Sequence, residues 1–187
     1  MAVTMNEYPW YEAVEGEDLC QGDLLVDFEV LLPRTLTADD TGQAPAEYKA
    51  FDLVIMTQTC DIVQGKVESL LLCPRWDLWS FVDEAKKRGE NWGKGIREDL
   101  RRGNLPGYHL LNDASQDGIR VQLGIVDFHE VYTAPTNLVG EFARSAGKRL
   151  RLLPPYREHL AQASARFFMR VGLPVDIPSE KIRSRPA

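Results

Sequence analysis

The side chains best suited to chemistry lie in one run of five polar residues, Thr57-Gln58-Thr59-Cys60-Asp61. The run directly follows four apolar residues, Leu53 to Met56, which cannot alternate between two faces and therefore predict a central strand buried on both sides. Hydroxyl, amide, thiol and carboxylate groups at the end of such a strand are held rigidly enough for catalysis or binding. Threonine and aspartate at strand ends also bond to nearby backbone. The run therefore indicates a place for a site, with a purely structural role still open.

Cys60 is the candidate nucleophile of this run. A reactive thiolate needs a neighbouring base, commonly histidine, and a third group that orients the base. We expect that Cys60, His129 and either Asp61 or Asp127 could converge in a thiol enzyme. The same residues could instead be a small buried thiol, a strand histidine and turn carboxylates, because cysteine is often buried and inert.

Metal and cofactor sites are less favoured by the spacing. Cys60, Asp61 and His129 lack the local spacing that metal ligands commonly show. Glycine-rich phosphate loops and the HExxH and GxSxG patterns are absent from the sequence. We therefore expect no metal and no cofactor, and we interpret His109 and His159 as a strand residue and a solvated helix residue.

Composition fits one domain over residues 1–174, followed by a flexible basic tail over 175–187. The chain has 187 residues, of which 44% are hydrophobic and 27% charged. No apolar run approaches the roughly 20 residues that span a bilayer, and the first residues lack the features of a secretion signal. Three scattered cysteines do not make a disulfide framework. A cytoplasmic protein without membrane contact is the expectation.

Charge is distributed unevenly along the chain. From Arg144 to the end, ten Lys and Arg stand against three Asp and Glu, although the whole chain has a net charge of −6. A basic C-terminal segment on an acidic body could contact a polyanion, an acidic partner or the body itself.

Periodicity predicts a β-rich chain with a helical insertion. Alternation over Leu24–Pro33 predicts a strand with Leu24, Val26, Phe28 and Val30 on one face. The remaining expected elements are a polar loop over 34–48, a hairpin with a tight turn from 53–56 to 67–73, a helical insertion at 76–107, a long strand over 119–132 with a bulge at Gly124, a short helix over 135–143, a strand over 150–153, and an amphipathic helix after Pro155 with Tyr156, Leu160, Ala163, Phe167 and Val171 in one stripe.

Several of these segments together resemble the first half of the PemK/MazF family. The resemblance covers roughly residues 20–75 and rests on Gly22-Asp23-Leu24-Leu25, Asp27-Phe28, Leu53 to Thr57, Gly65-Lys66-Val67 and Leu70 to Pro74. It implies a mostly β (α+β) fold, an SH3-like β-barrel, here with the helical insertion and the C-terminal helix. Members of this family act as ribosome-independent endoribonuclease toxins that are usually paired with an antitoxin.

The resemblance also implies a catalytic pair, an arginine just before the buried strand and a serine or threonine just after it. Thr57 matches the hydroxyl position, but Phe51 stands at the arginine position and the nearest basic residue is Lys49. Without the guanidinium, the site lacks a permanently charged, bidentate phosphate clamp, for which lysine is a poor substitute. The acidic body also disfavours RNA, whose binding depends on phosphate neutralisation.

These arguments favour a non-catalytic or weakly active binding module that acts through a protein partner, with a homodimer possible. Nucleic acid is a possible further ligand, with Lys49, Arg75, Arg149 and Arg151 as candidate contacts. The first alternative is an active endoribonuclease of a toxin–antitoxin or bacterial defence system, which would use Thr57 with Lys49 or Arg75. The second alternative is the Cys60-dependent thiol enzyme.

Overall fold

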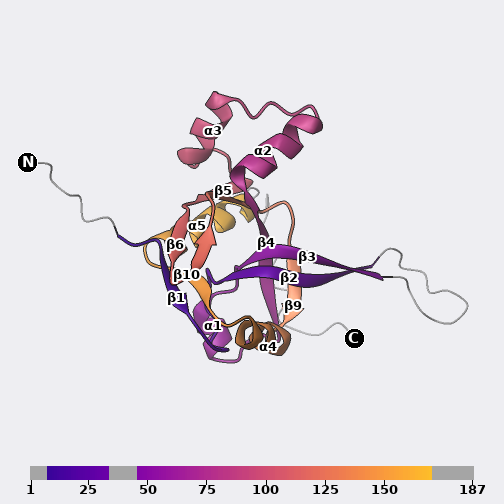
Figure 1. Ribbon diagram of the computed structural model, residues 1–187, viewed down its shortest axis with the longest axis vertical. Helices are drawn as coiled ribbons and strands as arrows, with labels where there is room; N and C mark the ends of the chain where they lie inside the picture. Colours follow the sequence, from indigo (N-terminus) through magenta and orange to yellow (C-terminus); the bar gives the residue numbers. More distant parts are fainter. Residues whose placement is uncertain (1–7, 34–45, 170–187) are drawn as a thin grey trace, which may run out of the picture.

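The computed structural model describes residues 8–33 and 46–169, which form a mixed α+β structure with a β-rich core (Figure 1). In chain order the elements are β1 (Tyr11–Val14), β2 (Leu24–Pro33), β3 (Ala46–Ile55), α1 (Thr59–Val63), β4 (Ser69–Asp77), α2 (Leu78–Lys87), α3 (Lys94–Arg101), β5 (Tyr108–Leu111), β6 (Ala114–Gln116), β7 (Ile119–Val121), β8 (Gly124–Asp127), β9 (Tyr132–Pro135), α4 (Thr136–Ala146), β10 (Arg149–Leu152) and α5 (Tyr156–Phe168).

The main sheet is six-stranded and antiparallel, in the order β2-β3-β4-β8-β5, with β9 also paired to β4. β4 is its centre, because it pairs with β3, β8 and β9 along different parts of its length. Within the described ranges no pairing joins β5 to β2, and β1 with β10 forms a separate two-stranded sheet. The β-rich α+β class is confirmed, but the sheet does not close into the expected barrel.

The run from Leu53 is buried on both faces of the sheet, as predicted. Val54 packs in one hydrophobic cluster with Leu24 and Leu152. Leu53 and Ile55 point to the other side, into a second cluster that contains Leu25, Phe28 and Leu72. β3 therefore separates two cores, which explains why its sequence is continuously apolar here.

A β-bulge changes which residues of β2 face the core. The register between β2 and β3 shifts between Leu25 and Phe28, where Asp27 has a φ of 55°. As a result Leu24 and Leu25 are both buried, in different clusters, and Phe28 continues the face of Leu25. The prediction that Val26 faces the core is wrong, because its side chain is 48% exposed.

The connections around β4 differ from the sequence prediction in detail. β3 and β4 pair as an antiparallel hairpin, but their connection contains α1 in addition to the expected turn, which lies at Gln64 and Gly65. The strand expected over 119–132 is divided among β7, β8 and β9, which belong to three different pairings. Gly124 lies against the Arg75 guanidinium, so close that an added Cβ would be 2.5 Å from Arg75 Nε.

The predicted helical insertion is present between β4 and β5 as α2 and α3, which project from the sheet (Figure 1). Asp77 caps α2 by accepting a hydrogen bond from the Ser80 backbone N–H. The insertion has its own small core, in which Phe81, Trp92 and Leu100 pack together.

The two predicted C-terminal elements are also present. The short helix is α4 and the amphipathic helix is α5, whose Tyr156, Leu160, Ala163 and Phe167 pack against the first hydrophobic cluster. Val171, the basic tail over 175–187 and most of the polar loop lie outside the described residues. No helix within the described residues has the length and apolar character that a membrane crossing requires.

Gly22 joins the two sheets and provides a test of this arrangement. Its N–H donates to the Ile55 carbonyl and its carbonyl accepts from the Leu152 N–H, while its φ is +84°. An added Cβ would lie 2.9 Å from the Cβ of Leu152. We therefore expect Gly22→Ala to lower the free energy of unfolding by roughly 2–3 kcal/mol, measured by urea denaturation with tryptophan fluorescence.

Gly65→Ala is the matched control. Gly65 also has a positive φ, of 62°, but no atom lies within 4 Å of the position that an added Cβ would take. Only the left-handed backbone penalty remains, about 1 kcal/mol. Equal losses for the two variants would show that the contact between Gly22 and Leu152 does not constrain the fold.

Candidate functional site

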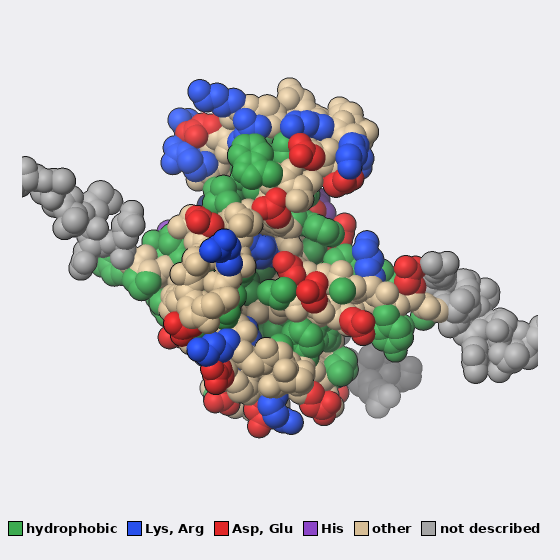
Figure 2. Space-filling view, viewed as in Figure 1, with side chains coloured by type: hydrophobic (Ala, Val, Ile, Leu, Met, Phe, Trp, Pro, Cys, Tyr) green, Lys and Arg blue, Asp and Glu red, His purple; other side chains and the backbone are tan. Residues whose placement is uncertain are grey.

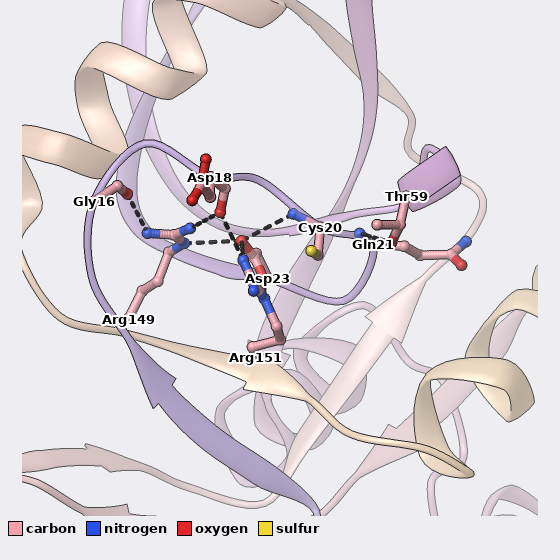
Figure 3. Close-up of polar contacts among 8 residues, drawn as sticks. All are labelled: Gly16, Asp18, Cys20, Gln21, Asp23, Thr59, Arg149 and Arg151. Atoms are coloured by element: carbon pink, nitrogen blue, oxygen red, sulfur yellow. Dashed lines mark hydrogen bonds and ion pairs between the residues drawn. The ribbon is translucent and has the colours of Figure 1, made fainter. Parts of the chain in front are cut away.

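A buried ion cluster lies at the junction of the two sheets (Figure 3). Asp23 is 0% exposed and its carboxylate accepts from Arg149 Nε at 2.9 Å. It also accepts from Arg151 Nε at 2.5 Å and Nη2 at 3.0 Å, and from the Cys20 backbone N–H at 3.2 Å. The hydrogen bond to Asp23 raises the pKa of Arg151. One carboxylate thus holds two guanidinium groups from β10.

The same arginines fix the segment that precedes β2. Arg149 Nη1 donates to the Gly16 carbonyl at 2.7 Å, and Arg149 and Arg151 each donate through Nη2 to the Asp18 carbonyl. Buried charges are tolerated only when they are paired and their hydrogen bonds are satisfied. The cluster is therefore an internal tie between the loop at 16–23 and β10.

The four predicted nucleic-acid contacts lie in different surroundings. Arg149 and Arg151 are engaged by Asp23, and Arg149 is only 5% exposed. Arg75 is also buried, donates to the Gln122 carbonyl and lies 3.8 Å from the Asp52 carboxylate. Lys49 alone of the four candidates is exposed, with its Nζ 4.8 Å above the Phe51 ring. The structure does not bring the four side chains together on a common surface.

In the polar run after β3, the two threonine side chains form hydrogen bonds with main-chain groups. Thr57 Oγ1 accepts a hydrogen bond from the Leu71 N–H at 2.7 Å. Thr59 Oγ1 accepts from the Gln21 N–H at 3.1 Å, as Figure 3 shows. Gln21 in turn donates through Nε2 to the Met56 carbonyl at 2.7 Å. Both hydroxyls therefore attach the start of α1 to its neighbours.

Cys60 is exposed in α1, beside two polar side chains of its own segment. Its Sγ lies 3.6 Å from Gln58 Oε1 and 3.8 Å from Asp61 Oδ1. Asp61 Oδ1 is also 3.8 Å from Lys66 Nζ. The described part of the chain places no histidine in a hydrogen bond with this thiol.

His129 has a different partner. Its Nδ1 lies 2.7 Å from Asp127 Oδ1, which also accepts from the His129 N–H, and its ring contacts those of Tyr108 and Phe167. Asp127 belongs to β8, which pairs with β5 beside the helical insertion, whereas α1 lies at the opposite end of the body (Figure 1). The four residues thus form two separate pairs, Cys60 with Asp61 and His129 with Asp127.

A cleft that the sequence interpretation missed lies between α3, β5 and α5. Its volume is about 450 Å³, within the range typical of ligand sites. Its polar and aromatic lining residues are Arg101, Arg102, Arg166, His109, His159, Gln162, Trp10, Tyr108 and Tyr156.

A helical pattern could have revealed part of this cleft. His159, Gln162, Ala163 and Arg166 follow the i, i+3, i+4, i+7 spacing that places side chains on one helix face. Nothing in the sequence, however, shows that this face meets α3 and β5. The spacing alone therefore supports only a solvated helix residue at His159.

His109 lies in the wall of the cleft. Burial, followed by the positive charges of His159 and Arg166, lowers the pKa of the His109 imidazole to about 4. His109 is therefore neutral near pH 7, and the arginines supply the positive charge of the cleft at that pH.

No group of three His, Cys, Asp or Glu side chains within the described ranges is arranged to hold a metal ion. Comparisons of the chain with protein-family models, with curated proteins and with solved structures find no match.

Replacing Asp23 tests the ion cluster. Asp23→Asn leaves Arg149 buried without a counterion, so we expect the free energy of unfolding to fall by about 3 kcal/mol or more in urea denaturation. The control is Glu17→Gln, which removes an ion pair between the exposed side chains of Glu17 and Arg144 and should change stability little. Similar stabilities for the two variants would contradict the importance of the buried pairing.

The three thiols should differ in reactivity towards iodoacetamide. Burial and the charge of Asp127 raise the pKa of Cys73 to about 12, and its side chain is fully buried. At about pH 8 we expect Cys60 to be alkylated first and Cys73 only after unfolding, as detected by mass spectrometry of tryptic peptides. Cys60→Ser should remove the fastest-reacting site, and modification of Cys73 in the native protein would contradict the structure.

Proposed function

We propose that this protein is a binding module on the PemK/MazF plan that acts through a protein partner and does not cleave RNA at Thr57. The observation that carries the proposal is the hydrogen bond from the Leu71 N–H to Thr57 Oγ1. A hydroxyl that acts in phosphoryl chemistry needs a cation or base within hydrogen-bond reach. Among the described residues, the polar contact of this hydroxyl is with backbone instead.

The surroundings of Phe51 support the same conclusion. Its ring lies 6.1 Å from that of Trp76 and 5.0 Å from that of Tyr132, and its side chain is buried. An aromatic side chain packed in this way occupies the position at which the resemblance places the catalytic arginine. Arg75 does not replace it, because its guanidinium is buried, donates to the Gln122 carbonyl and lies 3.8 Å from the Asp52 carboxylate.

The resemblance itself is supported by the antiparallel β2-β3-β4 arrangement over residues 20–75. We include an SH3-like plan in the proposal, with the sheet left open between β2 and β5. Free thiols at Cys20, Cys60 and Cys73 support a reducing compartment, and we place the protein in the cytoplasm on that basis.

A protein partner is supported by the arm that β2 and β3 form away from the body (Figure 1). Leu31 and Tyr48 face each other across its two strands and are 53% and 68% exposed. Paired apolar side chains of this kind are typical of contact surfaces, in which tyrosine is enriched. The partner that contacts this surface is a second copy of the chain or a different protein.

The test is incubation of the purified protein with total RNA. We expect no cleavage above that of a buffer control, and no difference between wild type and Thr57→Ser, which keeps the hydroxyl. Cleavage that disappears in Thr57→Ala but survives in Thr57→Ser would overturn the proposal and favour the endoribonuclease alternative. Thermal unfolding of each variant shows whether the loss of the hydrogen bond to Leu71 has altered the fold.

A further inference from the structure

The cleft between α3, β5 and α5 has a lining suited to anions. Three arginines and two histidines line it, and its described lining residues include no Asp or Glu, in a chain of net charge −6. The low pKa of His109 arises first from burial and then from the positive charges of His159 and Arg166, which oppose its protonation. Figure 2 shows Lys and Arg side chains over the adjoining α2 and α3, with Asp and Glu side chains among them.

The charge of two of these arginines is partly balanced. Arg101 and Arg102 both bind Glu98, whose pKa falls to about 2, chiefly through its hydrogen bond with Arg101. Glu98 therefore stays ionised and offsets one of the two positive charges. Arg166 makes no ion pair within the described part of the chain, and its Nε reaches the Gln162 carbonyl only at 3.4 Å. One guanidinium is thus available for an incoming anion.

Aromatic rings form another part of the lining. The rings of Trp10 and Tyr156 are stacked, with centroids 3.7 Å apart and an interplanar angle of 10°. Both residues line the cleft, as does Tyr108. Flat aromatic walls bind the faces of nucleobases, and arginine guanidinium groups bind phosphates in a bidentate manner. A carboxylate-rich peptide would use the arginines but not the aromatic wall.

We propose that this cleft binds a nucleotide unit, with its phosphate at Arg166 and the Arg101–Arg102 pair and its base against the aromatic lining. The unit can come from a free nucleotide or from a single-stranded nucleic acid, since both present the same phosphate and base. The site is separate from Thr57 and from the arginines that Asp23 engages, so it stands whether or not the protein cleaves RNA.

The experiment measures fluorescence anisotropy of a labelled short oligouridylate with the full chain, and competition by ATP, by inorganic polyphosphate and by polyglutamate. We expect Arg166→Gln to weaken oligouridylate binding about tenfold or more, as loss of a charge-assisted hydrogen bond does. The slope of log affinity against log salt should become shallower by about 0.7 in the same variant. Arg120→Gln is the control, because it removes an equal charge from an exposed arginine on β7, outside the cleft.

Each outcome bears on the proposal. Competition by ATP as strong as by unlabelled oligouridylate assigns the site to free nucleotides, and much weaker competition assigns it to a strand. Equal weakening by Arg166→Gln and Arg120→Gln, competition by polyphosphate or polyglutamate as strong as by oligouridylate, or no binding at all would overturn it. Thermal unfolding controls for folding, and Arg102→Gln replaces Arg166→Gln if that variant is unfolded.

Discussion

The structure depends on one buried carboxylate. Asp23 binds Arg149 and Arg151, and those arginines in turn hold the carbonyls of the loop that leads into β2. Because Gly22 beside it bonds to both β3 and β10, the cluster sets where the main sheet meets the small β1–β10 sheet. An unpaired charge at this depth would be costly, so the three side chains fix one arrangement of the two sheets.

This tie also determines which polar groups remain for function. Thr57 and Thr59 attach the start of α1 to Leu71 and Gln21. Arg149 and Arg151 form ion pairs with Asp23. The residues with the most suggestive chemistry in the sequence therefore serve mainly to position backbone. Cys60 and Lys49 keep exposed side chains, but they lie in different elements, and neither has a described partner that would make it a catalytic group.

Elements outside the resemblance to PemK/MazF form a cleft lined by three arginines. α3 comes from the insertion between β4 and β5, and α5 follows the last strand. The three elements that meet there are distant in the chain. The end of α3 contributes Arg101 and Arg102, α5 contributes Arg166, and β5 contributes the neutral His109. Function resides in sites that a fold supports, so inserted helices can add a ligand site beside an existing sheet.

Local pattern was sufficient to predict much of the fold. The apolar run at Leu53, the helical periods of α2 and α5, and the antiparallel pairing of β3 with β4 follow from residue types and spacing alone. Tertiary structure decided the rest. The bulge at Asp27 turned Val26 outward. Asp23 drew Arg149 into the interior and bound the half-buried Arg151, and the fold kept Cys60 of α1 apart from His129. Each of these results depends on which distant groups come within a few ångströms, and sequence spacing carries no information about such distances.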